Sequence, residues 1–255
     1  MFSASDGYER FMGRWSRELA PMLVEFAGTA PGDAVLDVGC GTGALSVAAA
    51  AVSGVRVIGV DPSDDFVRFA TSHVRTGRIR FEVGQASALS FPDGQFDRTL
   101  SLLVLNFVPE PGAAVREMIR VTRSGGVIAA AVWDYASGMQ MLREFWHAAV
   151  ELDPAAAPRD ERHMPLCGDG ELAELLKLHR LTNVEQRELS IEMRFASFDD
   201  YWQPFLAGQG PAGAYTISLP DAARNTLEGK LRQRLSSSGA FTLNGRARAV
   251  RGVVT

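Results

Sequence analysis

Three closely spaced glycines follow a short apolar run and could bind a ligand through backbone atoms. The segment reads Val35-Leu36-Asp37-Val38-Gly39-Cys40-Gly41-Thr42-Gly43. Such a loop, placed between a buried strand and a helix, lets a ligand approach the backbone closely at the carboxyl edge of a sheet. Asp61 comes twenty residues after Gly41 and could accept hydrogen bonds from both ribose hydroxyls of an adenosine. The loop and the acid together predict an adenosine site.

The charge of this segment distinguishes among adenosine cofactors. A dinucleotide site normally has the pattern G-x-G-x-x-G, whereas this loop reads G-x-G-x-G with Ala44 at the third glycine position of that template. A P-loop would need a Gly-Lys-Ser/Thr ending, which the segment lacks. Asp37 would repel a pyrophosphate, but it suits a cofactor that carries a sulfonium and an ammonium and no phosphate. The charges therefore favour S-adenosylmethionine.

Short β-branched runs that alternate with longer amphipathic stretches predict the parallel sheet that would position this loop. Ser63 is a good helix N-cap, and Asp64 and Asp65 behind it complement the helix dipole. Pro31-Gly32 and Ser124-Gly125-Gly126 mark turns. Strands are expected at 34–38, 55–60, 79–83, 96–103 and 127–133, and helices at 16–28, at 44–51, from residue 63 onward and at 112–122.

Beyond Trp133 the pattern changes. Helices are expected at 139–151, 170–180, 198–205 and 220–235, strands at 183–195 and 246–254, a Pro- and Ala-rich linker through Pro165 and a Gly-rich loop at 208–213. Few residues separate these pieces from the sheet, so residues 1–255 are expected to form one domain. Its parts would be an N-terminal lid and helix (1–33), a cofactor-binding core (34–133) and a substrate cap with the final strands (134–255).

The composition excludes several classes of protein. Apolar residues make up 46% and charged residues 22% of the chain, which is typical of a soluble globular protein. A net charge of -4 gives no general attraction to nucleic acid or to anionic membranes. Cys40 and Cys167 are too few for a disulfide framework, which favours a reducing, cytoplasmic setting. The chain start lacks a signal-peptide pattern, and no apolar run approaches the roughly 18 residues of a membrane span.

Several motifs in order resemble those of the class I S-adenosylmethionine-dependent methyltransferases, in particular the small-molecule branch typified by ubiquinone and menaquinone biosynthesis methyltransferases. The resemblance extends from Ala34 to Trp133. It implies an α/β, Rossmann-like fold with a seven-stranded, mostly parallel sheet, helices on both faces and an antiparallel last strand pair. The segments that carry it are 35–43, Val60-Asp61-Pro62-Ser63, Gly84-Gln85-Ala86 with Leu89-Ser90-Phe91-Pro92, Phe96-Asp97 through Asn106, and 115–126.

The same resemblance implies how S-adenosylmethionine, and S-adenosylhomocysteine as its product, would be held. In this arrangement Gly39, Gly41 and Gly43 would line the methionine portion, and Asp61 would bind the ribose. Beside the adenine would lie Pro62, Ser63, Gln85 and Ala86. At the end of the fourth strand, Leu102 and Leu103 would cover the cofactor near the methionine.

Two positions depart from the family pattern. Gln85 stands where the family usually has Asp, so the hydrogen bond to the adenine amino group would come from an amide and be weaker. Asn106 stands where many members have His, which removes a candidate general base. The segment from Tyr8 to Trp15 resembles the cofactor lid of many relatives, in which Arg14 would meet the methionine carboxylate and Tyr8 would close over the site. Alternatively, Trp15 packs in the core and Arg14 is solvated.

Most of the residues that would bind the acceptor are aromatic. Phe198, Tyr201, Trp202 and Phe205 fall on one face of a helix, which is typical of a core face but also of the wall of an apolar pocket. Trp133, Tyr135 and Met139 follow the fifth strand, where this fold presents its substrate. The predicted acceptor-site residues are therefore Trp133, Tyr135, Met139, Tyr201, Trp202 and Phe205.

No catalytic base stands out. His147, His179 and His73 fit surface, packing and helix-end positions, so His163, Tyr135 and Tyr201 are the only candidates for proton transfer. No spacing suggests a metal site. Because the methyl donor is already activated, catalysis can rest on holding the acceptor close and aligned in a dry site.

The sequence thus predicts a methyltransferase that acts on a small apolar or aromatic molecule at oxygen, nitrogen or carbon, by in-line displacement. The partners expected are this small-molecule acceptor and, at most, a second copy of the chain, so the protein would be a monomer or a homodimer. An RNA methyltransferase is one alternative, suggested by seven basic residues from Arg224 onward. However, Asn106-Phe107-Val108-Pro109 departs from the nucleobase-methylating motif, and neither cysteine follows a proline. A non-catalytic cofactor-binding scaffold is the other.

Overall fold

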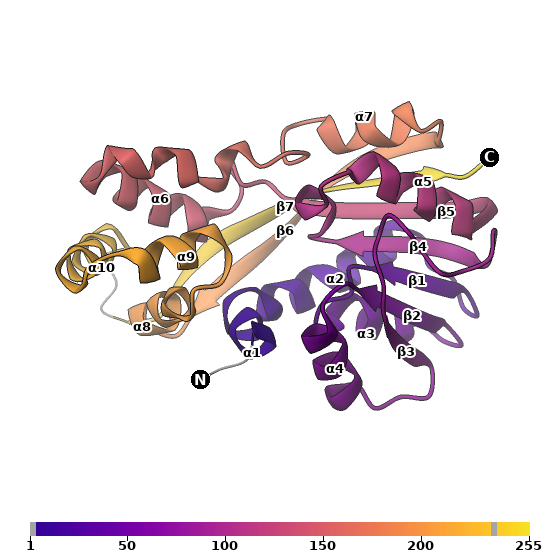
Figure 1. Ribbon diagram of the computed structural model, residues 1–255, viewed down its shortest axis with the longest axis horizontal. Coiled ribbons are helices and arrows are strands. Elements are labelled where there is room, and N and C mark those ends of the chain that lie inside the picture. Colours follow the sequence, from indigo (N-terminus) through magenta and orange to yellow (C-terminus); the bar gives the residue numbers. More distant parts are fainter. Residues whose placement is uncertain (1–3, 236–238) are drawn as a thin grey trace.

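Five parallel strands and a long antiparallel pair make up one seven-stranded sheet in the computed structural model, which describes residues 4–235 and 239–255 (Figure 1). The strand order is β3-β2-β1-β4-β5-β7-β6, and β7 runs antiparallel to both of its neighbours. This confirms the predicted fold class. The strands are β1 (Ala34–Val38), β2 (Arg56–Asp61), β3 (Ile79–Val83), β4 (Phe96–Leu102), β5 (Thr122–Trp133), β6 (Thr182–Phe195) and β7 (Phe241–Val253).

Helices cover both faces of the parallel part. The long helix α2 (Arg14–Phe26) packs beside α3 (Ala44–Ala50) on one face, while α5 (Pro111–Val121) and α7 (Glu171–Leu178) lie on the other (Figure 1). The helix α4 (Asp64–His73) begins as predicted, because the Ser63 hydroxyl accepts a hydrogen bond from the Phe66 backbone N–H at 3.4 Å. The strand order reverses between β1 and β4, and a crevice opens outside the carboxyl ends at such a switch point.

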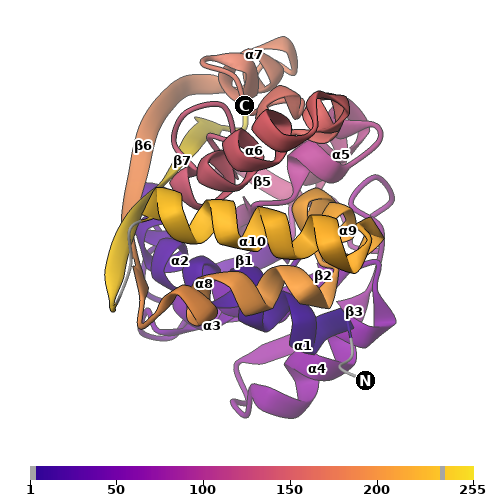
Figure 2. The same cartoon turned by 90° about the vertical axis from the view of Figure 1, so that its left-hand side faces the viewer.

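The far halves of β6 and β7 extend beyond the parallel strands and carry a group of helices, here called the cap. Figure 2 shows these helices stacked over the end of the sheet. Aromatic rings fill the space beneath them: Phe145 stacks on Phe205 at 4.6 Å between centroids, and Trp202 is buried. The cap helices are α6 (Gln140–Leu152), α8 (Phe198–Trp202), α9 (Gly210–Ser218) and α10 (Asp221–Leu235), with 3-10 turns at Pro154–Arg159, Glu161–His163 and Gln203–Ala207.

Three segments differ from the prediction. The Gly-rich loop expected at 208–213 is largely helical, because Pro211 is compatible with the first turn of α9. The turn expected at Ser124-Gly125-Gly126 belongs to β5, whose pairing with β4 shifts register between Phe96 and Arg98, as a bulge does. The strand β7 begins five residues before the expected Arg246, since it pairs with the whole of β6.

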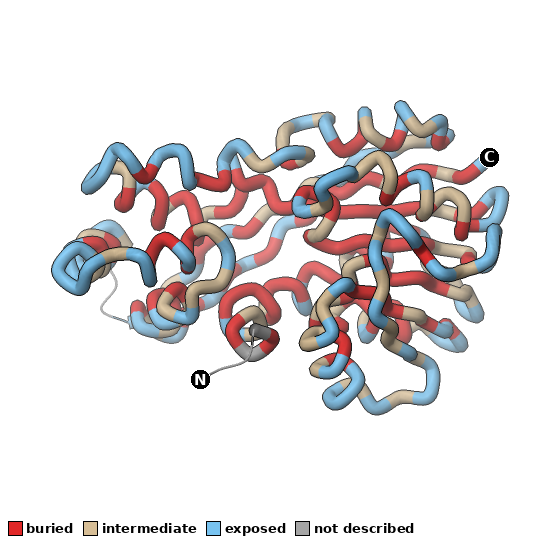
Figure 3. The backbone as a smooth tube through the Cα atoms, viewed as in Figure 1, coloured by how far each residue is buried: buried red, intermediate tan, exposed pale blue. Residues whose placement is uncertain are grey.

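The N-terminal segment connects the core to the cap. It forms α1 (Ala4–Tyr8) and a π-helical turn (Glu9–Gly13) before α2. The Ser5 backbone N–H donates to the Asp65 carboxylate on α4 at 3.0 Å, and Gly7 lies against Gln209 of the cap. Buried residues run continuously from the sheet into the cap (Figure 3). Within the described residues, no helix is both long and apolar enough to cross a lipid bilayer.

Candidate functional site

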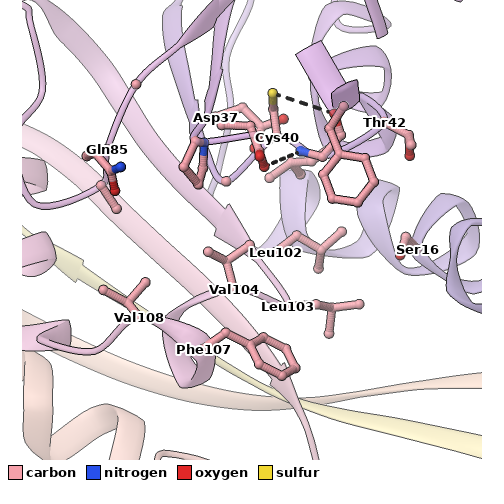
Figure 4. A pocket seen from close by; sticks show the side chains of 18 of the residues that line it. Ser16, Asp37, Cys40, Thr42, Gln85, Leu102, Leu103, Val104, Phe107 and Val108 are labelled. Carbon is pink, nitrogen blue, oxygen red and sulfur yellow. Dashed lines mark hydrogen bonds between the residues drawn. The ribbon is translucent and has the colours of Figure 1, made fainter. Parts of the chain in front are cut away.

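The carboxyl ends of β1, β2 and β4 open into a cavity of about 570 Å³. Figure 4 shows an apolar group on one side of it and Asp37, Cys40 and Thr42 on the other. Residues from the predicted glycine loop, from the end of β2 and from the N-terminal segment all contribute to the lining. The lining residues that the sequence predicted are Tyr8, Gly39, Gly41, Asp61, Pro62, Gln85, Ala86, Leu102 and Leu103.

Each of the three glycines in the loop is needed for a different structural reason. Gly39 has a φ of +76°, and a side chain there would meet Val104 at 2.5 Å, so only glycine lets Val104, which follows β4, approach the loop. Gly41 has a φ of +51°, and a Cβ there would meet nothing within 4 Å because it would enter the cavity. Gly43 precedes α3 and faces Phe81, so it does not line the cavity, contrary to the prediction. Gly41 is therefore the position that leaves room for a ligand.

Asp61 holds the loop as well as facing the cavity. Its carboxylate accepts hydrogen bonds from the backbone N–H groups of Gly41 at 3.0 Å and Ser63 at 2.9 Å. Burial raises the pKa of the carboxyl, and these two hydrogen bonds oppose that rise. Ser63 itself caps α4 and lies outside the cavity lining. Because a carboxylate has about four lone-pair sites, Asp61 can also accept from a ligand.

Asp37 is a second buried carboxylate on the cavity wall. It is 1% exposed, and its Oδ2 accepts a hydrogen bond from the Ser46 hydroxyl at 2.6 Å. Its Oδ1 has no hydrogen-bond partner among the described residues. Burial raises the pKa of this carboxyl to about 7, opposed by the Ser46 hydroxyl. A cationic ligand group would satisfy this oxygen and favour its ionised form.

The opposite wall is apolar. Leu102 ends β4, and Leu103 follows it with a φ of +63°, a strained value for a leucine that is typical of functional sites. Val104, Phe107 and Val108 extend this wall, and Phe107 is 55% exposed at its rim. Gln85 lies at one end of the cavity (Figure 4). This arrangement combines a polar, anionic side with a dry apolar side.

The N-terminal segment contributes Tyr8 but not Arg14. The Tyr8 ring packs on Phe66 at 5.5 Å, and its hydroxyl is 3.1 Å from that of Ser16, which also lines the cavity. Arg14 instead donates two hydrogen bonds to the Asp200 carboxylate, at 2.9 and 3.1 Å, and lies over the Trp15 ring. The structure thus places Arg14 outside the site predicted for it, because a carboxylate from the cap binds its guanidinium.

None of the six predicted acceptor-site residues lines the cavity. All are buried: Trp133, Tyr135, Met139, Tyr201, Trp202 and Phe205 are at most 6% exposed. The Tyr201 hydroxyl donates to the Met141 carbonyl at 3.0 Å, and Phe205 stacks in the cap. The aromatic face of α8 is therefore a core face here.

The proposed bases are not brought to the cavity either. His163 is exposed in the turn after Pro154–Arg159 and lies outside the lining. Tyr201 is fully buried, and burial raises its pKa well above the usual value. Across the part of the chain that the structure describes, no group of His, Cys, Asp and Glu side chains could hold a metal ion.

Sequence reasoning missed several residues of the lining. Ser16, Phe66 and Glu110 reach it from α2, from α4 and from the loop before α5. Phe66 could have been predicted, since it occupies the first turn of a helix that starts directly after Asp61, the residue predicted to bind the ribose. Ser16 carried none, because its position depends on how α2 crosses the sheet. Phe107 and Val108 follow β4 directly and could have been predicted from the switch-point geometry.

Comparisons with known proteins agree with this geometry. Residues 36–130 match a family described as the methyltransferase domain. The chain is 36% identical over 121 residues to 2-methyl-6-phytyl-1,4-hydroquinone methyltransferase of Synechocystis sp., which covers 47% of this chain and 38% of that protein. It is 30% identical over 213 residues to an uncharacterized protein of Mycobacterium tuberculosis, which covers 80% of this chain and 74% of that one.

Solved structures share the fold. The YcgJ protein of Bacillus subtilis superposes with a TM-score of 0.61 at 21% identity, over 92% of this chain and 97% of that one. The chain spans only 38% and 58% of the first curated relatives that it matches. The Mycobacterium tuberculosis relative, however, is matched over most of its length, and the family segment contains the glycine loop, Asp61 and the β4 wall. The chain therefore belongs to the class I S-adenosylmethionine-dependent methyltransferase family.

Proposed function

We propose that this chain transfers a methyl group from S-adenosylmethionine to a small apolar or aromatic molecule. The observation that carries the proposal is the pair of buried carboxylates, Asp37 and Asp61, which line one cavity together with Gly41. No Lys or Arg lines this cavity in the described chain. An anionic, phosphate-repelling wall suits a cofactor with a sulfonium and an ammonium.

In this proposal each part of the cofactor would have a partner in the cavity. Asp61 would accept from the ribose hydroxyls, the unpartnered Oδ1 of Asp37 would face the cationic methionine end, and Gln85 and Ala86 would contact the adenine. When S-adenosylmethionine is bound, a lone pair of the acceptor would form the new bond to its methyl carbon, while the sulfur would keep the electron pair of the broken sulfur-carbon bond and leave as the neutral thioether of S-adenosylhomocysteine. The wall of Leu102, Leu103 and Val104 excludes water from that position, so that acceptor and methyl group meet without a competing nucleophile.

The remaining expectations belong to the same proposal. Residues 1–255 act as one catalytic unit, in which the segment 1–33 and the cap close over the core of 34–133. The protein works as a monomer or homodimer in a reducing, cytoplasmic compartment, which the free, buried thiols of Cys40 and Cys167 support. Nucleic acid is not the expected acceptor, because the cavity lining lacks basic side chains in the described residues.

Replacing Gly41 with alanine tests the site directly. Its methyl group would enter the cavity, so Gly41→Ala should weaken the binding of S-adenosylmethionine and S-adenosylhomocysteine at least about fivefold in calorimetric titrations, since overpacking a filled site costs more than about 1 kcal/mol. Gly32→Ala is the matched control: Gly32 also has a positive φ, of +86°, and open space around its Cβ position, but it lies in the turn before β1, outside the cavity.

The control separates strain from binding. Both variants should lose a similar stability, about 1 kcal/mol, because alanine is disfavoured at a positive φ. Only Gly41→Ala should lose cofactor affinity. Failure of the folded wild-type protein to bind either compound would contradict the proposal. Binding without transfer to any of a broad panel of acceptors would favour the scaffold alternative instead.

A further inference from the structure

The cavity takes its lining from the first part of the chain. In the part that the structure describes, the lining residues run from Tyr8 to Glu110, and none comes from the cap or from the strands that carry it. The aromatic rings beneath the cap pack against one another instead, as Phe145 and Phe205 do. An acceptor that meets the bound cofactor must therefore be held by residues of this cavity and its mouth.

Four consecutive residues between β4 and α5, Phe107-Val108-Pro109-Glu110, all line the cavity and are here called the mouth loop. Figure 4 shows Phe107 and Val108 on the same side of the cavity as Val104. Phe107 is 55% exposed, and Pro109 and Glu110 are exposed as well, so this loop reaches from the cavity to the surface. Apolar side chains that are exposed at the edge of a cavity offer a surface that a ligand can cover.

Glu110 ends the mouth loop with a carboxylate that has no partner. It occupies the N-cap position of α5, but its side chain makes no capping hydrogen bond. Within the described residues its side chain also takes part in no ion pair. The positive end of the α5 dipole stabilises a negative charge at this position. The mouth therefore presents an unpaired negative charge directly beside exposed apolar side chains.

The other charges of the cavity have the same sign. Asp37 and Asp61 are the further carboxylates of the lining, and no Lys, Arg or His lines it in the described chain. S-adenosylmethionine carries two cationic groups and one carboxylate, so it offsets only part of this negative charge. A cavity that stays negative with its cofactor bound attracts cations and repels anions. Glu110 carries this charge at the mouth, where an acceptor enters.

We propose that the mouth loop binds the methyl acceptor and that Glu110 pairs with an ammonium group on it, so that the acceptor is an amphipathic cation. This rests on the proposed methyl transfer. The apolar part of the acceptor covers Phe107 and extends along the wall that Val104 continues. A protonated ammonium nitrogen has no lone pair, so the atom that receives the methyl group is a different one, on the apolar part. Glu110 determines specificity and takes no proton from the acceptor.

Such a mouth discriminates by charge. Three probes that share one ring system measure this: 1-naphthylmethylamine, which is a cation at pH 7, 1-naphthalenemethanol, which is neutral, and 1-naphthoic acid, which is an anion. The experiment is equilibrium dialysis of each probe against folded protein saturated with S-adenosylhomocysteine. None of the probes needs to be the natural acceptor, because the test compares their affinities.

The wild-type protein should bind the amine about fivefold more tightly than the alcohol, as expected for one ion pair at the surface, and the acid about fivefold more weakly than the alcohol. The preference for the amine should fall to about twofold or less in 1 M NaCl, because salt screens exposed charges. Glu110→Gln should reduce it to the same level at low salt and leave the affinity for S-adenosylhomocysteine within about twofold.

Two further variants separate charge from ring contact. Glu18→Gln is the matched control, because Glu18 is exposed on α2 two residues after Ser16 but does not line the cavity. It makes the same change of charge and should retain the full preference for the amine. Phe107→Ala should weaken all three probes to a similar extent, by about fivefold, and keep their order, because it removes apolar contact area and no charge.

The outcomes are separable from those of the proposed function. If S-adenosylhomocysteine does not bind, the proposed function fails. If it binds and the wild-type protein binds no probe, or binds the amine no better than the alcohol, only this inference fails. An amine preference that survives Glu110→Gln, or a loss of S-adenosylhomocysteine affinity in that variant, would also overturn it. So would unchanged probe affinities in Phe107→Ala, because the probes would then bind away from the mouth loop.

Discussion

Asp37 and Asp61 are two buried carboxylates that face one cavity, and no cation within the described residues neutralises either one there. Burial is the largest cause of the raised pKa of both groups. Their ionisation is therefore coupled to whatever binds. A cationic ligand favours the ionised carboxylates, so it must release protons when it binds near neutral pH.

The affinity for S-adenosylmethionine should consequently depend on pH. The Asp37 carboxyl has a pKa of about 7 in the free protein, so affinity should rise as pH increases from about 6 to about 7.5 and ionised Asp37 becomes the major form. Asp37→Asn should weaken binding at the upper end and flatten the profile. Calorimetric titrations in buffers of different ionisation enthalpy would measure both the affinity and the protons released.

Ser46→Ala provides the control for this profile. Its hydroxyl donates to Asp37 at 2.6 Å and lowers the carboxyl pKa, so removing it should shift the midpoint to higher pH without removing the dependence. If the affinity of the wild-type protein for S-adenosylmethionine changes by about twofold or less between pH 6 and 7.5, Asp37 does not face the bound cation.

The residues predicted from the sequence were those whose partners are close in the chain. The glycine loop and Asp61 follow from strand-turn-helix chemistry over about twenty residues, and the hydrogen bond between Gly41 and Asp61 spans that interval. Arg14 could not be placed in the same way, because Asp200, which binds it, lies 186 residues away. The pattern of Tyr201, Trp202 and Phe205 is the same for a core face and for a pocket wall, so only packing could decide between them.

At the scale of elements, Arg14 connects the first turn of α2 to α8 of the cap. Its guanidinium binds Asp200 through two hydrogen bonds and lies 4.9 Å from the centre of the Phe195 ring at the end of β6. A partly buried ion pair in which one guanidinium nitrogen donates to both carboxylate oxygens, together with a ring contact, contributes on the order of 1 kcal/mol. Arg14 therefore holds the cap to the N-terminal helix, and its charge is not available to the cavity.

Arg14→Met should lower the free energy of unfolding by about 1 to 2 kcal/mol in chemical denaturation and leave S-adenosylmethionine affinity within about twofold. Asp200→Asn should reproduce the loss of stability, because it removes the other half of the same pair. If Arg14→Met instead lost affinity for S-adenosylmethionine with an unchanged free energy of unfolding, Arg14 would belong to the cofactor site.

The predicted elements were right where hydrophobic patterning was strong and shifted where glycine and proline were interpreted as breaks. Gly125 and Gly126 lie within β5 because the register shift against β4 accommodates the extra residues. Gly210 and Pro211 open α9, where Pro211 loses no helical hydrogen bond. In both places, contacts with distant parts of the chain decide between a break and a continued element, and the local sequence does not contain them.

At the scale of the whole molecule, the cap contains a buried carboxyl of its own. Glu161 is 4% exposed, accepts a hydrogen bond from the indole N–H of Trp146 and lies in the turn after the buried ion pair of Arg143 with Asp160. Burial raises the pKa of Glu161 to about 7. Because the folded state holds this proton more tightly than the unfolded state, the contribution of Glu161 to stability falls as pH rises.

Relative to the wild type, Glu161→Gln should therefore have a higher free energy of unfolding at pH 8 than at pH 5. The difference in unfolding free energy between variant and wild type should increase over this interval by up to about 3 kcal/mol, the upper limit set by a pKa that moves from 4.5 to about 7. The amide oxygen retains an acceptor for Trp146. Urea denaturation at both pH values measures the difference, with the exposed Glu174→Gln as the control. A difference that does not change with pH would contradict a buried, proton-holding Glu161.

The strand order determines which parts of the sheet can form before the end of the chain is synthesised. The strand β7 pairs with both β5 and β6, yet it follows every other described element in the sequence. A chain that still lacks β7 therefore leaves β6 without a partner and β5 with an open edge. Glu185, Arg187 and Glu188 give the waiting β6 a charged surface that discourages pairing with other nascent chains. The five parallel strands can assemble during translation, whereas the cap must wait for β7 before it has a sheet to rest on.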